Sequence, residues 1–195
     1  MIGVDASADM LEEALEKRDE SGHDILYLQQ DMTSFELYGT VRAVLCLCDS
    51  LNYLLKEEDL LQTFRLVNNY LDPGGCFVFD MNTRHKYEDI LGSRTIAESR
   101  EEGSFIWENE FDRESGINTY MLTLYLSVED GLYERSEEVH LQRAYPIRRV
   151  MELLEEAGLR CEAVYREGTG EPGTEECERV FFVAVEQQKK KEKKY

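Results

Sequence analysis

The first half of the chain alternates between short apolar runs and amphipathic helical segments. This alternation is typical of a mainly parallel sheet whose strands are joined by crossover helices. It predicts, in order, residues 1–4 (strand), 7–18 (helix), 25–29 (strand), 41–47 (strand), 59–71 (helix) and 76–81 (strand). Because the run at 41–47 is apolar at nearly every position, we expect that strand to be buried on both faces.

The pattern changes near residue 95, where apolar and polar residues begin to alternate between turn signals. Alternation with a period of two predicts strands, and sequences such as Glu129-Asp130-Gly131 predict the turns between them. We therefore expect an insert of three or four antiparallel strands over 95–143. A helix over 147–157 follows, opened by Pro146 and ended by Gly158.

Two apolar runs close the chain, at 160–165 and 179–185, and a polar, glycine-bearing segment joins them. We interpret the pair as antiparallel strands. A chain of 195 residues fits one domain with a full core, so we expect a single α/β domain over 1–188. The antiparallel insert is too small to fold alone. The lysine-rich end, 189–195, is interpreted as a solvated basic tail.

Composition narrows the function classes. The formal net charge of −19 argues against nucleic acid as a partner, and no apolar run approaches the length of about 20 residues that spans a membrane. The chain starts without the features of a secretion signal and has five cysteines, an odd number, which favours a reduced, cytoplasmic location. Cys46 and Cys48 lack a four-ligand grouping and are interpreted as small core residues, not metal ligands.

The start of the chain carries the first functional signal. Asp5 follows an apolar run directly and precedes a helix that Ser7 can cap. In doubly wound α/β proteins, an acid at this place accepts hydrogen bonds from both hydroxyls of a nucleotide ribose. We expect this role for Asp5, and the alternative is an exposed acid that happens to precede a helix.

Four segments, taken in their order along the chain, carry a resemblance to a known family. They are Gly3-Val4-Asp5-Ala6-Ser7-Ala8-Asp9-Met10-Leu11, Gln30-Asp31-Met32, Cys48-Asp49-Ser50-Leu51-Asn52-Tyr53-Leu54 and Leu71-Asp72-Pro73-Gly74-Gly75. With them, nearly the whole chain resembles the class I S-adenosylmethionine-dependent methyltransferases of the bacterial small-molecule type (EC 2.1.1). The resemblance implies a Rossmann-like sheet of order 3-2-1-4-5-7-6, mainly parallel with the last strand antiparallel. This chain is similar to strands two to seven of that sheet.

The resemblance also implies how S-adenosylmethionine is held. Asp5 would bind the ribose hydroxyls, and Ala6 and Met10 would lie along the adenine. Asp31 would accept the adenine amino group, with the backbone of Met32 facing the ring.

The methionine end of the cofactor would lie near the strand at 41–47, against Leu47, Cys48, Asp49 and Asn52. Each polar residue in these sets has a structural alternative: Asp31 as a turn acid, Asp49 as a helix cap and Asn52 as a loop residue. Met10 is more often plain helix core.

One part of the family pattern is missing. The first strand of the family ends in a glycine-rich turn, whose backbone amides approach the carboxylate-bearing end of the cofactor, and this sequence has no such turn. Without that strand, two strand edges of the sheet centre are left open. We therefore expect an N-terminally truncated form with impaired cofactor binding, able to pair strands or dimerise through the exposed sheet centre.

Candidates for the acceptor side come from the exit of the antiparallel insert, which in relatives covers the site. They are His140, Arg143 and Tyr145, spaced so that alternate residues of a strand could share a face. The alternative is that His140 and Arg143 are solvated and that Tyr145 anchors the following helix. Asn82, at the end of the strand at 76–81, is a weaker candidate by its position.

Three functions remain open. The first is methyl transfer from S-adenosylmethionine to a small-molecule acceptor. The second is a non-catalytic methyltransferase-like partner subunit that pairs its open edges with another chain. The third is a nicotinamide-dependent dehydrogenase fragment, which the terminal antiparallel pair disfavours.

Overall fold

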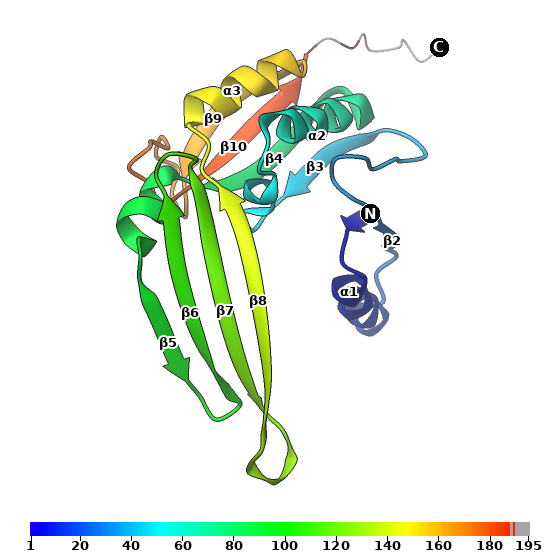
Figure 1. Cartoon of the computed structure of the whole chain (residues 1–195). Coiled ribbons are helices and arrows are strands. Elements are labelled where there is room, and N and C mark those ends of the chain that lie inside the picture. The colour runs from blue at the N-terminus through cyan, green and yellow to red at the C-terminus, as the bar shows by residue number, and fades with distance from the viewer. Residues whose placement is uncertain (188, 190–195) are drawn as a thin grey trace.

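The computed structural model describes residues 1–187 and 189, with their strands in three sheets (Figure 1). The core sheet has the order β3-β4-β10-β9, formed by Val41–Cys46, Leu71–Asn82, Arg179–Glu186 and Leu159–Arg166. β3 runs parallel to β4, and β10 runs antiparallel to both β4 and β9. The reversed last strand and the antiparallel closing pair are therefore confirmed.

Two helices cover one side of the core sheet, α2 (Glu57–Tyr70) and α3 (Ile147–Glu156), and Figure 1 shows them side by side. Phe79 of β4 is the centre of the packing beneath them. Its ring lies 5.5 Å from that of Phe64 on α2 and 4.8 Å from that of Phe182 on β10. All three rings are buried, and aromatic side chains bury more apolar surface than any others.

The N-terminal unit, β1 (Ile2–Asp5), α1 (Ala8–Ser21) and β2 (Leu26–Gln29), forms a separate parallel pair of strands with one helix. Ser7 caps α1 as expected, because its Oγ accepts from the backbone N–H of Met10 at 3.2 Å. In the described chain no ladder joins β1 to β3. The two ladders β2-β1 and β3-β4-β10-β9 match strands 3-2 and 4-5-7-6 of the expected order.

Three sequence-based expectations are wrong around β3. The strand is not buried on both faces, since Leu45 is 66% exposed, because β3 has a neighbour only on its β4 side. β3 ends at Cys46, so Cys48 lies beyond it and is exposed, whereas Cys46 packs against the core. The strand expected over 76–81 begins earlier, at Leu71, so Gly74 and Gly75 lie within β4, the neighbour of β3.

The antiparallel insert is confirmed as a four-stranded sheet of order β5-β6-β7-β8. Its strands are Thr95–Ser99, Gly103–Asp112, Ile117–Ser127 and Tyr133–Arg143, and Figure 1 shows them extending away from the core sheet. Short helical turns not foreseen from the sequence are η1 (Ser50–Tyr53) and η2 (Lys86–Leu91). A third, η3 (Glu129–Gly131), lies where the sequence predicts a turn between strands.

The end of the chain differs from the expected solvated tail at Lys189. Its ammonium group donates to the backbone carbonyls of Asn69 at 2.8 Å and Leu71 at 2.6 Å, so it caps the carboxyl end of α2. The rest of the tail, 190–195, lies outside the described residues. Among the residues described, no helix is long and apolar enough to span a membrane.

Candidate functional site

A cavity of about 330 Å³ lies where the carboxyl ends of β3 and β4 meet the antiparallel insert. Ligands of open α/β sheets bind outside the carboxyl ends of the strands, so the cavity lies where the fold predicts a site. Residues at the strand ends of the core sheet and residues of the antiparallel insert together form its walls. The lining residues are Asp49, Tyr53, Asn82, Lys86, Trp107, Tyr120, Leu122, His140, Gln142 and Arg179.

The floor of the cavity is an ion-pair cluster centred on Arg179, the first residue of β10. Its guanidinium lies 2.7 Å from Asp49 Oδ1 and 2.8 Å from Asp80 Oδ2. Burial alone would lower the pKa of Arg179, but the two carboxylates outweigh it and raise that pKa. Arg179 therefore stays charged and joins the ends of β3, β4 and β10.

Asp49 also connects this cluster to the insert. Its backbone N–H donates to Asp80 Oδ2 at 2.9 Å, and its Oδ2 accepts from Gln142 Nε2 of β8 at 2.7 Å. Cys48 and Asp49 both have left-handed backbone conformations, with φ of 62° and 49°. Such conformations cost free energy in residues other than glycine and are concentrated at functional sites.

Asn52 holds three segments together beneath the cavity and is fully buried. Its Nδ2 donates to the backbone carbonyls of Asn82 at 3.2 Å and Arg143 at 2.9 Å, and its Oδ1 accepts from the Asn82 N–H at 2.9 Å. Its side chain thus binds protein backbone and fixes the ends of β4 and β8 around the site.

His140 of β8 lies in the cavity wall between two polar partners. Its Nδ1 is 3.2 Å from the hydroxyl of Tyr53, and its Nε2 is 3.0 Å from Glu138 Oε2. Burial, with added repulsion from Asp49 and Glu138, raises the pKa of Tyr53, so this phenol stays protonated at neutral pH. A carboxylate that orients an imidazole is a common arrangement for general acid–base chemistry.

Arg143 and Tyr145 do not join His140 in the cavity lining. Arg143 donates to the carbonyl of Leu55 at 2.8 Å, and Tyr145 donates to that of Leu54 at 2.5 Å. Burial raises the pKa of Tyr145 to about 12. Along β8, residues 140 and 143 have opposite parity and therefore opposite faces, so this pair anchors the connection to α3.

The residues expected to hold the nucleoside lie on the N-terminal unit. Asp5 Oδ1 accepts from the Ser7 N–H at 2.8 Å, and Asp31 Oδ1 accepts from the Thr33 N–H at 2.7 Å. Hydrogen bonds from the Thr33 side chain and backbone lower the pKa of Asp31. The Gln30 N–H donates to the Asp5 carbonyl at 2.9 Å, so the two acids follow adjacent ends of parallel strands.

The remaining expected cofactor residues are mostly accessible. Ala6, Met10, Leu47 and Cys48 are exposed, whereas Met32 is half-buried and packs against the hydrophobic core. The expected set therefore divides between the end of the β1–β2 pair and the end of β3.

Sequence reasoning missed several residues of the cavity lining, among them Trp107, Gln142 and Arg179, and also Asp80, which pairs with Arg179. Asp80 did carry a signal, because it is a lone acid inside the apolar run at 76–81 and such an acid needs a partner. Trp107, Gln142 and Arg179 lie in alternating strand patterns that are typical of ordinary surface residues. Only the pairing register of their strands brings these three residues together.

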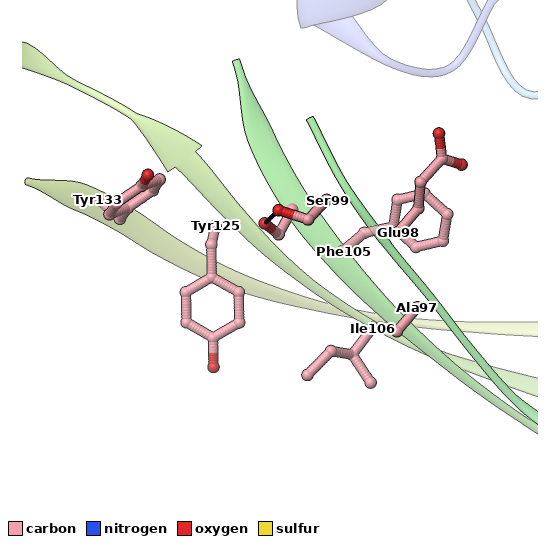
Figure 2. Close-up of a pocket in the computed structure, with 8 residues that line it drawn as sticks. Ala97, Glu98, Ser99, Phe105, Ile106, Tyr125 and Tyr133 are labelled. Carbon is pink, nitrogen blue, oxygen red and sulfur yellow. Dashed lines mark hydrogen bonds between the residues drawn. The ribbon is translucent and has the colours of Figure 1, made fainter. Parts of the chain in front are cut away.

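A second hollow lies on the insert and is formed by β5, β6, β7 and the start of β8 (Figure 2). Most of its lining, including Ile106 and Tyr125, lies on the face of the insert opposite to Trp107. The hydroxyls of Ser99 and Ser104, 2.9 Å apart, bridge two of its strands. It lies away from the strand ends that define the first cavity.

Comparison with known proteins gives a consistent result. Residues 1–75 match the family model described as a methyltransferase domain. A protein of Geobacillus sp. (strain WCH70), assigned as a methyltransferase, is 35% identical over 184 residues, which cover 94% of this chain and 74% of the relative. A protein of Bacillus subtilis (strain 168), assigned likewise, is 33% identical over 187 residues, with the same coverage of 94% and 74%.

Solved structures agree with these relatives. The S-adenosylmethionine-dependent methyltransferase of Clostridium acetobutylicum ATCC 824 aligns with a TM-score of 0.90 at 25% identity, over 95% of this chain and 74% of that one. The sugar N-methyltransferase KedS8 of Streptoalloteichus sp. aligns with a TM-score of 0.75 at 21% identity, over 96% and 71%. The second likeness is one of fold alone.

Proposed function

Because this chain belongs to the S-adenosylmethionine-dependent methyltransferases, we propose that its cavity receives a small-molecule acceptor for methyl transfer, a reaction of class EC 2.1.1. One observation carries this proposal. The cavity lies at the carboxyl ends of β3 and β4, and the antiparallel insert supplies half of its wall. An acceptor bound there would lie next to the strand end at which the family resemblance places the methionine part of the cofactor.

The residues present fit the nucleoside half of S-adenosylmethionine. Asp5 and Asp31 offer two carboxylates at adjacent strand ends, and carboxylates are the groups that accept from ribose hydroxyls and an adenine amino group. Ala6 and Met10 are exposed beside them and would lie along the adenine. When bound, the cofactor supplies a methyl group that its sulfonium already activates.

The role of the protein at the acceptor is to align it and to accept its proton. His140 is the group placed for this, because its ring lies in the wall and Glu138 and Tyr53 hold its two nitrogens. An acceptor hydroxyl would lose its proton to the His140–Tyr53 pair as a lone pair of its oxygen became the nucleophile. Arg143 and Tyr145 serve as positioning residues that fix the end of β8.

In this proposal, cofactor affinity depends on the missing pairing, among the described residues, between β1 of the N-terminal unit and β3 of the core sheet. Ile2 and Val4 on β1 and Leu45 on β3 are exposed apolar residues on strands that each have an unpaired edge in the described chain. Open apolar edges pair readily with another strand. The proposal includes a strand, from a partner or a second copy, that fills this gap and completes the support of the cofactor.

The same exposed edges favour the second candidate, a non-catalytic partner subunit. The dehydrogenase alternative loses its basis, since the family is that of methyltransferases and β10 is antiparallel to its neighbours. All five cysteines are free thiols, which supports the proposal of a reducing, cytoplasmic location.

Calorimetric titration with S-adenosylhomocysteine tests the proposal. We expect weak binding, with a dissociation constant in the high micromolar to low millimolar range, and Asp5→Ala should weaken it by about 1 to 3 kcal/mol through the loss of charged hydrogen bonds. The matched control is Glu16→Ala, an exposed acid elsewhere on α1. No binding at millimolar ligand, or equal losses in the two variants, would contradict the assignment of this nucleoside site.

A further inference from the structure

The wall that the insert gives to the cavity is apolar and aromatic. Trp107 on β6 stands directly opposite Leu122 on β7, and the Trp107 ring meets that of Tyr120 edge to face at 5.0 Å. All three side chains are half-buried, and none belongs to the hydrophobic core of the protein. In the described structure they line the cavity instead.

Two buried polar atoms of the cavity lining have no hydrogen-bond partner among the described residues, Trp107 Nε1 and Asn82 Oδ1. Asn82 is only 4% exposed. An unpaired buried polar group costs about 1 to 3 kcal/mol, so such groups call for a partner. One is a donor on the insert and the other is an acceptor at the end of β4.

The charges of the cavity lining are already matched within the protein. Arg179 pairs with Asp49 and Asp80, and Lys86 pairs with Glu178 at 2.6 Å. A charged head group would therefore enter without a free counter-charge and would lose its hydration. An uncharged group suits this lining better than a carboxylate or an ammonium.

We propose that the cavity is specific for a small molecule with a flat apolar body and an uncharged hydroxyl group, as in a phenol. In the bound ground state the hydroxyl oxygen accepts from Trp107 Nε1 and its hydrogen is donated to Asn82 Oδ1, and during methyl transfer that hydrogen passes from Asn82 to the His140–Tyr53 pair. The apolar body lies against Trp107, Tyr120 and Leu122. This inference rests on the proposed function only in naming the phenol as the methyl acceptor, because the binding site itself does not require the cofactor.

The test uses a probe that the chain already contains. Trp107 is its one tryptophan, so tryptophan fluorescence and the single indole N–H resonance both report on this cavity. Titration with para-cresol should change the fluorescence and move the indole resonance downfield. Toluene, which lacks the hydroxyl, should bind about tenfold more weakly, the loss expected for two neutral hydrogen bonds. The charged analogues para-toluate and para-methylbenzylammonium should bind at least as weakly as toluene.

Two neighbouring residues of β7 give a matched pair of variants. Leu122→Ser places a hydroxyl in the cavity wall and should weaken para-cresol binding several-fold. Met121→Ser changes the opposite, outer face of the same strand and should leave the affinity unchanged. Asn82→Leu removes the proposed acceptor but keeps the backbone bonds to Asn52, so it should lower the affinity for para-cresol part of the way to that for toluene, because the bond from Trp107 Nε1 remains.

Several results would overturn the inference. They are no response to para-cresol at millimolar concentration, equal binding of toluene, tighter binding of either charged analogue, or equal effects of Leu122→Ser and Met121→Ser in variants that keep the wild-type melting temperature. The calorimetric test of the cofactor site is independent. Binding of para-cresol without cofactor binding would support this site and contradict the proposed function, and the reverse result would contradict this site alone.

Discussion

The core sheet and the N-terminal unit are built from similar alternations of strand and helix and reach very different degrees of burial. In the core sheet, helix α2 buries Leu60, Thr63, Phe64 and Val67 against β4 and α3. In the N-terminal unit, α1 has no buried residue, and its Met10 is 60% exposed. An amphipathic stripe is therefore compatible with a helix in both places, whereas burial of the stripe depends on the strands that the sheet places beneath it.

The largest expected effect of a single substitution is in the core sheet. Phe79→Ala removes a ring that packs within 5.5 Å of the Phe64, Phe77 and Phe182 rings and should lower the free energy of unfolding by about 3 to 5 kcal/mol. Leu15→Ala on α1, at a 38% exposed side chain, should cost less than about 1 kcal/mol. Urea denaturation followed by circular dichroism measures both changes, and similar losses would contradict the contrast between the two units.

A middle-sized effect is expected from filling the gap between β1 and β3. A peptide that carries an apolar strand followed by a glycine-rich turn should pair with the two open edges and stabilise the chain by mass action, by about 2.7 kcal/mol at a hundredfold excess over its dissociation constant. The backbone amides of β1 should become protected from hydrogen exchange.

The control for this experiment is a peptide of the same composition in scrambled order. Thermal denaturation with each peptide, at matched concentrations, separates strand pairing from non-specific binding. An unchanged melting temperature at saturation with the strand peptide would mean that the separation of the two ladders does not create a binding site.

The weakest of these effects is expected from the helix cap of α1 in the N-terminal unit. Ser7→Ala removes the hydroxyl that accepts from the Met10 N–H and should destabilise α1 by about 1 kcal/mol. Because this unit has little core of its own, the loss should appear in hydrogen exchange of α1 and leave exchange in α2 unchanged. Equal acceleration in both helices would show that the two units unfold as one.

Much of the site lay beyond what the sequence could indicate. The family resemblance placed Asp49 near the cofactor, and the position of Asn82 at the carboxyl end of a strand made it a candidate. The pairing of Asp49 with Arg179 joins residues 130 positions apart, and no local pattern encodes such a contact. His140 was selected from the sequence together with Arg143, yet the register of β8 gives these two residues different surroundings.

The amino-acid sequence specified the order and type of nearly every element, because hydrophobic periodicity and capping residues such as Ser7 and Pro146 act over a few neighbouring positions. It also determined the antiparallel insert and the reversed last strand, whose turn signals are local. The folded arrangement was needed to show which strand edges remain open, which face of β8 lines the cavity and which buried polar atoms lack a partner among the described residues. These features depend on strand pairing and register between distant segments, and a shift of one residue would have placed His140 on the outer face.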